Sequence, residues 1–278
     1  MKRIFALILG AVITAATLAS CGNSGSDEIT VVSREDGSGT RSAFVELMGI
    51  LQDDKDMTYE RAEISNSTSV VMSTVAGNAN AIGYISLGSL NDSVKAVKVD
   101  GVEATVDNVK SGSYKVSRPF NIATKDDLSD LAKDFISFIL STDGQAIVAE
   151  DYIALDATES YTPSGLTGKI TLAGSTSVSP LMEQLAAAYK EINPDVTIEI
   201  QQSGSSAGIQ SAIEGVCDIG MASREIKEDE INAGLTPTVI ALDGIAVIVN
   251  NDNEVSDLTS EQIKNIYTGE VTSWSDVK

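Results

Sequence analysis

Histidine is absent from the 278-residue chain, and cysteine occurs only twice, as Cys21 and Cys217. Without histidine, neither a Ser-His-Asp nor a Cys-His catalytic arrangement can be built, and the commonest metal ligand is missing. We therefore expect no catalytic triad, no metal site and no cofactor. Basic residues are also scarce, since 19 lysines and arginines stand against 40 acidic residues for a formal charge of −21. Such an acidic chain repels nucleic acid, so we predict no nucleic-acid partner.

The first 20 residues have the layout of a signal peptide. Lys2 and Arg3 precede an apolar run over residues 4–16 that is too short to span a membrane comfortably, and small residues follow it. The sequence Leu-Ala-Ser-Cys that ends at Cys21 resembles the lipobox of bacterial lipoproteins. We expect a signal peptide over residues 1–20, lipidation of Cys21 and a tether over residues 21–27, which together predict an extracytoplasmic protein anchored to the cell membrane. The alternatives are an ordinary signal peptide with an incidental cysteine, or a membrane-spanning anchor.

Short apolar runs alternate with helical patterns through the rest of the chain, which is typical of an α/β protein. The predicted strands are residues 29–33, 81–86, 169–173, 196–202 and 238–250. Apolar residues recur at helical spacing in three segments, which are residues 43–51, 128–138 and 181–192. Thr259 and Gln262 have the spacing of a capping box at the start of a further helix. The length suits one large lobe or two small ones.

Three segments share one design, in which a strand is followed by glycine, serine and threonine and then by a helix. They are residues 34–40 (REDGSGT), 174–180 (GSTSVSP) and 203–208 (SGSSAG). Each places hydroxyl groups and free backbone N–H groups at a helix N-terminus, where the helix dipole also favours an anion. One such loop is usually a plain helix cap, but three of them, one opened by Arg34, predict an anion-binding site.

A serine hydrolase is the competing interpretation, because residues 204–208 match the G-x-S-x-G pattern of a nucleophile elbow. In a chain without histidine, Ser206 or Ser38 would need another base. Lys190 and Lys227 are the lysines considered for that role, and neither is close to the loop in sequence. We therefore predict a binding protein rather than an enzyme.

Longer segments resemble the phosphate-binding proteins of phosphate ABC transporters. Residues 169–250, with GSTSVSPLMEQ, QQSGSSAGI and DIGMASREI, are similar to the first half of that family. Residues 29–86, with VVSREDGSGTRSAF and AIGYIS, are similar to its second half. The final DLTSEQIKNIYTGEVTSWSDVK resembles the piece that usually leads into the DGSGT strand. These segments make up most of the chain after the signal peptide, and the DGSGT loop with its preceding arginine is specific to the family.

The order of the segments is rotated relative to the family, in which the GSTS loop comes first. We interpret this as circular permutation, with residues 160–168 joining the family's usual C-terminus to its usual N-terminus. A fragment of a longer, duplicated protein is the alternative. The resemblance implies a two-lobed α/β fold of the type II periplasmic-binding-protein kind, with the ligand in the cleft between the lobes. One lobe would comprise residues 94–245, and the other residues 28–93 with 246–278.

Carried over position by position, the resemblance implies a phosphate site contributed by both lobes. Its residues would be Thr176, Ser177 and Ser205 from one lobe and Arg34, Ser38, Gly39 and Thr40 from the other. Asp36 would orient Arg34, and Ser223 would support the site. The protein would be a monomer that captures phosphate and delivers it to the permease of an ABC importer. Two alternatives stay open: a related oxyanion such as sulfate as the ligand, and phosphate sensing instead of transport.

One position departs from the family. Many members have an aspartate directly after the segment that matches residues 222–223, and this aspartate accepts the proton of hydrogen phosphate and so rejects sulfate. Here that position is Arg224, which cannot accept a hydrogen bond. Arg224 would either contact the anion or form an ion pair with Glu225 or Glu228. The missing aspartate leaves three alternatives. Another carboxylate accepts the proton of hydrogen phosphate, discrimination between phosphate and sulfate is weaker, or the ligand is a different anion. The carboxylates considered are Asp36, Asp243 and Glu225.

Overall fold

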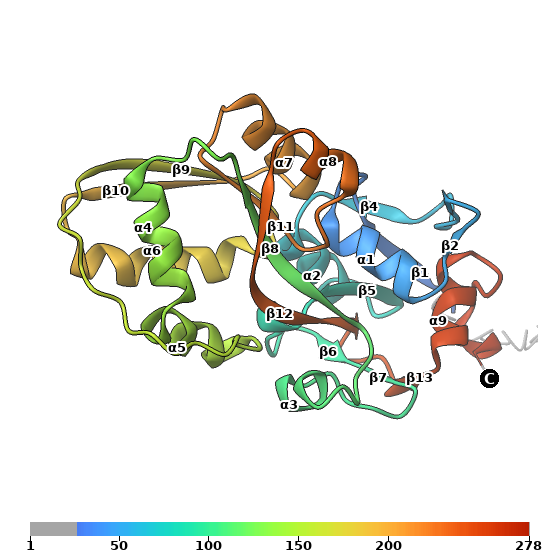
Figure 1. Cartoon of the computed structure of the whole chain (residues 1–278). Coiled ribbons are helices and arrows are strands. Elements are labelled where there is room, and N and C mark those ends of the chain that lie inside the picture. Colours follow the sequence, from blue (N-terminus) through green and yellow to red (C-terminus); the bar gives the residue numbers. More distant parts are fainter. Residues whose placement is uncertain (1–26, 278) are drawn as a thin grey trace, which may run out of the picture.

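The computed structural model describes residues 27–277, which form two α/β lobes joined by long strands (Figure 1). The expected signal peptide, Cys21 and most of the tether lie outside the described residues. Among residues 27–277, no helix combines the length and the apolar character needed to cross a membrane.

A nine-stranded sheet runs through both lobes. Its strands are β1 (Thr30–Arg34), β4 (Glu63–Ser65), β5 (Ala81–Ser86), β6 (Lys95–Ala96), β8 (Ser117–Thr124), β9 (Gly168–Gly174), β10 (Val196–Gln202), β11 (Ile219–Ala222) and β12 (Thr236–Val249). They lie in the order β10-β9-β11-β8-β12-β5-β1-β4, and β6 pairs with β12. At one end β9 is parallel to β10 and β11, and at the other end β1 is parallel to β4 and β5. The five strands predicted from apolar runs are β1, β5, β9, β10 and β12, whereas β8 and β11 were not predicted.

The helices cover both ends of this sheet. They are α1 (Gly39–Leu47), α2 (Thr68–Ala76), α3 (Val106–Lys110), α4 (Asp130–Leu140), α5 (Thr142–Asp151), α6 (Ser179–Ile192), α7 (Ser205–Glu214), α8 (Glu228–Asn232) and α9 (Ser260–Tyr267). The predicted capping box is confirmed at α9, where Thr259 Oγ1 accepts from the N–H of Gln262 at 3.1 Å and the Gln262 side chain accepts from the N–H of Thr259 at 2.8 Å. Two small strand pairs complete the fold: β2 (Leu51–Gln52) with β3 (Lys55–Asp56), and β7 (Lys98–Val99) with β13 (Asp257–Leu258).

Two large hydrophobic cores correspond to the two lobes. In the core of the first, which we call lobe B, β1, β5 and α1 pack around the stacked rings of Phe44 and Tyr84. In the core of the second, lobe A, α4 and α6 pack around the rings of Phe135, Phe138 and Tyr189. In Figure 1, α4 and α6 lie at the left and α1 and α9 at the right.

The boundary between the lobes falls where β12 changes partner. Residues 236–244 of β12 pair with β8, and residues 245–249 pair with β5. Residues 94–116, expected in the same lobe as β9, instead contribute Val97, Val109 and Tyr114 to the core of lobe B. We therefore propose that lobe B comprises residues 27–116 and 245–277, and lobe A residues 117–244. Within residues 27–277, the chain passes from one lobe to the other only through β8, β12 and the adjoining loops.

The two ends of the described chain meet on lobe B. The N–H of Ile29 donates to the carbonyl of Thr272 at 2.8 Å, and the N–H of Trp274 donates to the carbonyl of Asp27 at 3.0 Å. Glu28 and Ser273 form an antiparallel bridge between these bonds. The strand β1 thus begins beside the last residues of the chain, which is the arrangement that a circular permutation requires.

Candidate functional site

Four helices begin at the boundary between the lobes, and their first turns meet there. α1 and α2 belong to lobe B, and α6 and α7 to lobe A. Thr40 in the first turn of α1 lies 2.9 Å from Ser177, which precedes α6, measured between hydroxyl oxygens. Thr68, the first residue of α2, lies 3.1 Å from the same Ser177 oxygen. The three glycine- and serine-rich loops predicted as one site are therefore brought together, and α2 adds a fourth N-terminus.

The hydroxyl groups at this boundary form one network, which we call the hydroxyl cluster. Its members are Thr40, Thr68, Ser175, Thr176, Ser177 and Ser223. None of the six residues is more than 6% exposed. Ser175 Oγ donates to Ser223 Oγ at 3.0 Å, and Ser223 Oγ lies 3.2 Å from Thr40 Oγ1. The cluster thus joins the lobes through side chains that can both donate and accept hydrogen bonds.

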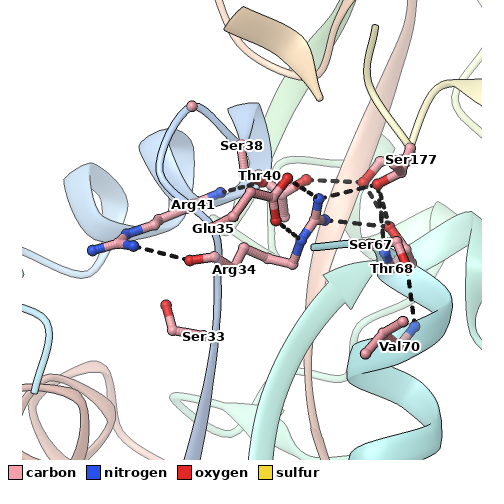
Figure 2. Close-up of polar contacts among 12 residues, drawn as sticks. Ser33, Arg34, Glu35, Ser38, Thr40, Arg41, Ser67, Thr68, Val70 and Ser177 are labelled. Atoms are coloured by element: carbon pink, nitrogen blue, oxygen red, sulfur yellow. Dashed lines mark hydrogen bonds and ion pairs between the residues drawn. The ribbon is translucent and has the colours of Figure 1, made fainter. Parts of the chain in front are cut away.

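Arg34 brings a positive charge to the hydroxyl cluster from the end of β1. Its side chain is 3% exposed, and its Nη2 donates to Thr176 Oγ1 at 3.0 Å. Figure 2 shows the guanidinium group between Glu35 on one side and Thr68 and Ser177 on the other. Both Nε and Nη2 donate to the Glu35 carboxylate at 2.8 Å. This bidentate pairing fixes the plane of the guanidinium group.

Asp36 does not orient Arg34, so that expectation was wrong. The chain turns at residues 36–37, where Gly37 has a φ of 84°. The turn leaves the Asp36 side chain exposed, and its Oδ1 accepts from the N–H of Gly37 at 3.0 Å. Glu35 precedes the turn and folds back along Arg34, and therefore takes the orienting role.

Gly39 lies where the two lobes touch. A Cβ atom added to Gly39 would be 2.4 Å from Ser205 Oγ and 2.8 Å from Ser223 Oγ. The N–H of Ser206 also donates across the boundary, to the carbonyl of Gly37 at 3.0 Å. A residue without a side chain is therefore needed at position 39 for the lobes to approach this closely.

Several buried backbone donors around the cluster are unused. Ser38 Oγ caps α1 by accepting from the N–H of Arg41 at 3.4 Å. Within residues 27–277, the first-turn N–H groups of Gly39, Thr40 and Ser205 have no acceptor. All three residues are buried. Buried N–H groups are rarely left unpaired, and free donors at helix N-termini suit an anionic ligand.

Arg224 is held away from the cluster by a carboxylate on α8. Its Nη1 and Nη2 donate to Glu230 at 2.8 and 2.7 Å, and Nη2 also lies 3.3 Å from Ser206 Oγ. Burial raises the pKa of Glu230, but hydrogen bonds from Arg224 and from the N–H of Lys227 outweigh it and lower that pKa below its usual range. The expected ion pair therefore forms with Glu230, not with Glu225 or Glu228. Arg224 Nε is buried and has no partner among the described residues.

Arg118, a buried residue of a crossing strand, was not predicted as a site residue. Arg118 on β8 donates to Thr40 Oγ1 at 3.1 Å and to Asp243 on β12 at 2.6 Å. Burial raises the pKa of Asp243 despite the opposing effect of Arg118. Asp243 is the single charge within the predicted apolar strand over residues 238–250, which indicates a buried partner for it, because a buried charge needs one. Thr68 was also missed, although the Ser-Thr-Ser run before an apolar helix is a cap pattern like the other three.

A pocket of about 320 Å³ opens beside the hydroxyl cluster. Thr68, Ser69 and Met72 line it from lobe B, and Thr176 and Gln202 from lobe A. None of the lining residues in the described part of the chain is charged. It connects the cluster to the surface along the line where the lobes meet.

The fold and the site define a two-lobed binding protein with donors for an anion between its lobes. A sequence model of the PBP superfamily domain matches residues 14–143 and 159–278. The phosphate-binding protein PstS 2 of Streptococcus agalactiae is 51% identical over 99% of this chain and 98% of its own length. The chain therefore belongs to the PBP superfamily and, within it, to the family of phosphate-binding proteins.

Two further comparisons bear on the fold and on the chain order. The crystal structure of a phosphate-binding protein of a phosphate ABC transporter from Streptococcus pneumoniae has 52% identity and a TM-score of 0.72, covering 90% of this chain and 100% of that one. The phosphate-binding protein PstS of Staphylococcus haemolyticus is 37% identical, but over only 40% of this chain and 38% of its own length. The expected two-lobed fold is confirmed by the first of these, and the relatives are named as binding proteins, as predicted, and not as enzymes.

Proposed function

We propose that this protein captures inorganic phosphate between its lobes outside the cytoplasm and delivers it to the permease of an ABC importer. The observation that carries the proposal is the meeting of Arg34 and four helix N-termini, two from each lobe, at one buried hydroxyl cluster. The names of the relatives support phosphate as the anion. Attachment through a lipid on Cys21 and a monomeric state are part of the same proposal.

The donors at the cluster are numerous enough for useful affinity. A hydrogen bond to a charged group contributes about 1.5–3 kcal/mol, and micromolar binding needs about 8 kcal/mol in total. The guanidinium group of Arg34, the cluster hydroxyls and the free N–H groups of Gly39, Thr40 and Ser205 together exceed this before association costs. The formal charge of −21 repels anions at long range, but screening limits that repulsion to about 8 Å at physiological salt.

Phosphate specificity would depend on the hydroxyl groups rather than on an aspartate. Of the three carboxylates considered as replacements, Asp36 and Glu225 are exposed. Asp243 is buried, but it accepts hydrogen bonds from Arg118 and Ser86. A serine or threonine oxygen can accept the proton of hydrogen phosphate, although less strongly than a carboxylate. We therefore propose that phosphate is preferred, with a smaller margin over sulfate than an aspartate would give.

The competing functions differ in what they require of the site. A phosphate sensor would use the same residues and would differ only in its partner. A hydrolase would need a base beside Ser38 or Ser206, but Ser38 Oγ caps α1 and Ser206 Oγ faces Arg224. Neither hydroxyl contacts a carboxylate or a lysine within residues 27–277, so the structure offers a hydrolase no base.

Replacing Arg34 tests the proposed site. We expect Arg34→Ala to weaken phosphate binding by at least about 100-fold, because it removes charge-assisted bonds and leaves Glu35 facing the anion. Equilibrium dialysis with radiolabelled phosphate measures this directly. Arg61→Ala is the matched control, since Arg61 is exposed and its replacement removes the same charge from the same lobe. Equal affinity of the two variants would rule out Arg34 as the anion-binding cation.

A further inference from the structure

Arg118 connects the crossing strands to both sides of the site. It lies on β8 directly opposite Asp243 on β12, and the two side chains are 3% and 1% exposed. Its Nε donates to the carbonyl of Ser223 in lobe A at 3.3 Å, and its Nη2 donates to Thr40 Oγ1 in lobe B at 3.1 Å. One guanidinium group therefore contacts a residue of each lobe at the point where the lobes join.

The remaining contacts of Arg118 fix its orientation. Nη1 donates to Asp243 Oδ2 at 2.6 Å and to the carbonyl of Gly244 at 2.8 Å. Asp243 is itself held by Ser86 Oγ at 2.8 Å and by the N–H of Gly88 at 3.3 Å. With its other nitrogens engaged on β12 and Ser223, Arg118 presents Nη2 to Thr40 in a defined position.

This contact decides how the Thr40 hydroxyl group can act. A guanidinium group can only donate, so Thr40 Oγ1 must accept from Arg118 and use its own proton as a donor elsewhere. The oxygens within reach are Ser177 Oγ at 2.9 Å and Ser223 Oγ at 3.2 Å. A hydroxyl that accepts from a cation is also a stronger donor, because hydrogen bonds in a chain polarise one another.

We propose that Arg118 is a positioning residue for the bound anion, which it does not touch: it locks the Thr40 hydroxyl group as a donor toward the hydroxyl cluster. This inference rests on the proposed capture of phosphate in that cluster. Arg34, at the end of β1, is proposed to contact the anion itself and also donates from Nη2 to Thr176 Oγ1. The two arginines thus turn one threonine of each lobe toward the anion, and Asp243 holds the second arginine in place.

A purely structural role is the competing account, in which the Arg118–Asp243 pair only joins β8 to β12. The two accounts differ in whether the effect of Arg118 passes through the hydroxyl group of Thr40. A double-mutant cycle isolates that dependence, because an interaction energy between two sites appears as non-additivity. Arg118→Lys retains the charge beside Asp243, but a compact ammonium group cannot reach all four acceptors at once.

The experiment measures phosphate affinity by calorimetry in four proteins: the unaltered chain, Arg118→Lys, Thr40→Val and the double variant. We expect Arg118→Lys to weaken binding about tenfold when Thr40 is present, as for loss of one hydrogen bond to a charged group. In the Thr40→Val background, Arg118→Lys should change phosphate affinity by less than about twofold. Equal fold-changes in both backgrounds would overturn the proposal and leave Arg118 with a structural role.

A second measurement applies if Arg118→Lys does not fold. In the unaltered protein labelled with 15N-arginine, the side-chain N–H signals of Arg118 should shift when phosphate is added, because Thr40 changes its hydrogen-bond partner while Arg118 stays bound to it. The exposed Arg61 serves as the internal reference. Unchanged Arg118 signals in a protein that binds phosphate would contradict the inference alone. A protein that does not bind phosphate at all would contradict the proposed function, and the inference with it.

Discussion

Two guanidinium groups donate into the hydroxyl cluster from different strands, Arg34 from β1 and Arg118 from β8. Each is paired with a carboxylate, Glu35 and Asp243 respectively, and this pairing fixes the orientation of the guanidinium group. Neither guanidinium can accept a hydrogen bond, so each one forces its threonine oxygen to accept and sets the direction of that hydrogen bond. At the scale of single residues, the site is therefore a set of oriented hydroxyl and guanidinium groups beside the N–H groups of Gly39, Thr40 and Ser205, which have no acceptor within residues 27–277.

Gly39→Ala tests whether the closed arrangement of the lobes is the binding form. The added Cβ atom would lie 2.4 Å from Ser205 Oγ and 3.1 Å from Ser205 Cβ, so either the lobes move apart or the serine hydroxyl groups at the boundary rotate away from their present positions. We expect phosphate affinity to fall at least about tenfold, because the donors of both lobes could no longer reach one anion. Calorimetric titration gives the affinity.

Thermal unfolding without phosphate is the control for Gly39→Ala. Gly39 is the first residue of α1, where alanine is tolerated, so the melting temperature should change little. If affinity is unchanged in a folded Gly39→Ala variant, the closed contact between the lobes plays no part in binding.

The residues of the site could be predicted from the sequence only where a local pattern marked them. Arg34, Thr40 and Ser177 stand in loops whose glycines and hydroxyls indicate helix N-termini, and the structure brings them together. The partner of Arg34 could not be predicted, because Glu35 and Asp36 are both carboxylates next to Arg34 in the sequence. Which of them pairs with Arg34 depends on where the turn begins. Arg118 carries no local pattern, and its role depends on pairing with a strand far away in the sequence.

At the scale of elements, β8 was missed because its sequence does not look like a central strand. It contains Arg118, Pro119 and Asn121, and polar residues and proline usually exclude an assignment to the middle of a sheet. The structure tolerates Pro119 because both backbone groups of its partner Leu242 bond to Ile153 on the other side. The buried polar residues of β8 make hydrogen bonds at the site. Arg118 donates to Thr40 Oγ1, and Asn121 donates to the carbonyl of Arg224. Local rules failed here at an element that serves the site.

The connector over residues 160–168, which carries no regular structure apart from the first residue of β9, is fastened to lobe A by Tyr161. Its hydroxyl group donates to Asp134 Oδ2 at 2.6 Å and accepts from Asn193 Nδ2 at 3.1 Å. The Tyr161 ring packs edge-on against Phe138. The connector is therefore anchored to α4 and to the end of α6 rather than hanging free.

Tyr161→Phe tests this anchoring. It removes both hydrogen bonds and keeps the ring, so we expect a loss of about 1 kcal/mol in the free energy of unfolding, or roughly 2–4 °C in Tm. Differential scanning calorimetry measures the shift, and phosphate affinity should stay unchanged because Tyr161 is remote from the cluster. A variant with unaltered Tm would show that the ring alone secures the connector.

At the scale of the whole molecule, the two lobes share one sheet and are joined by β8 and β12. The interlobe contacts between Gly37 and Ser206 and between Thr40 and Ser177 can form only when the lobes are together. Hinge motion about the two strands would open the pocket beside the cluster and admit the anion. In the closed form, two loops from each lobe surround the hydroxyl cluster.

The rotated order of the segments remains our proposal of a circular permutation. Residues 27–29 and 272–274 pair with each other beside the start of β1, so the rearrangement would leave the fold intact. The alignment with PstS 2 of Streptococcus agalactiae runs over 99% of this chain and 98% of that protein, so the two proteins share this order of segments. The match over two fifths of the staphylococcal relative is what a rotated order produces, because one alignment can follow only one half of the chain.

Calorimetric titration of the anion-free protein, first with phosphate and then with sulfate, tests the central claim most directly. Phosphate capture, as proposed, requires one phosphate per chain with micromolar or tighter affinity, and weaker binding of sulfate, because the cluster hydroxyls can accept the proton of hydrogen phosphate. Failure to bind phosphate, or equal affinity for both anions, would contradict it. The second result would mean that Arg224, in place of the aspartate, has changed the ligand of this site.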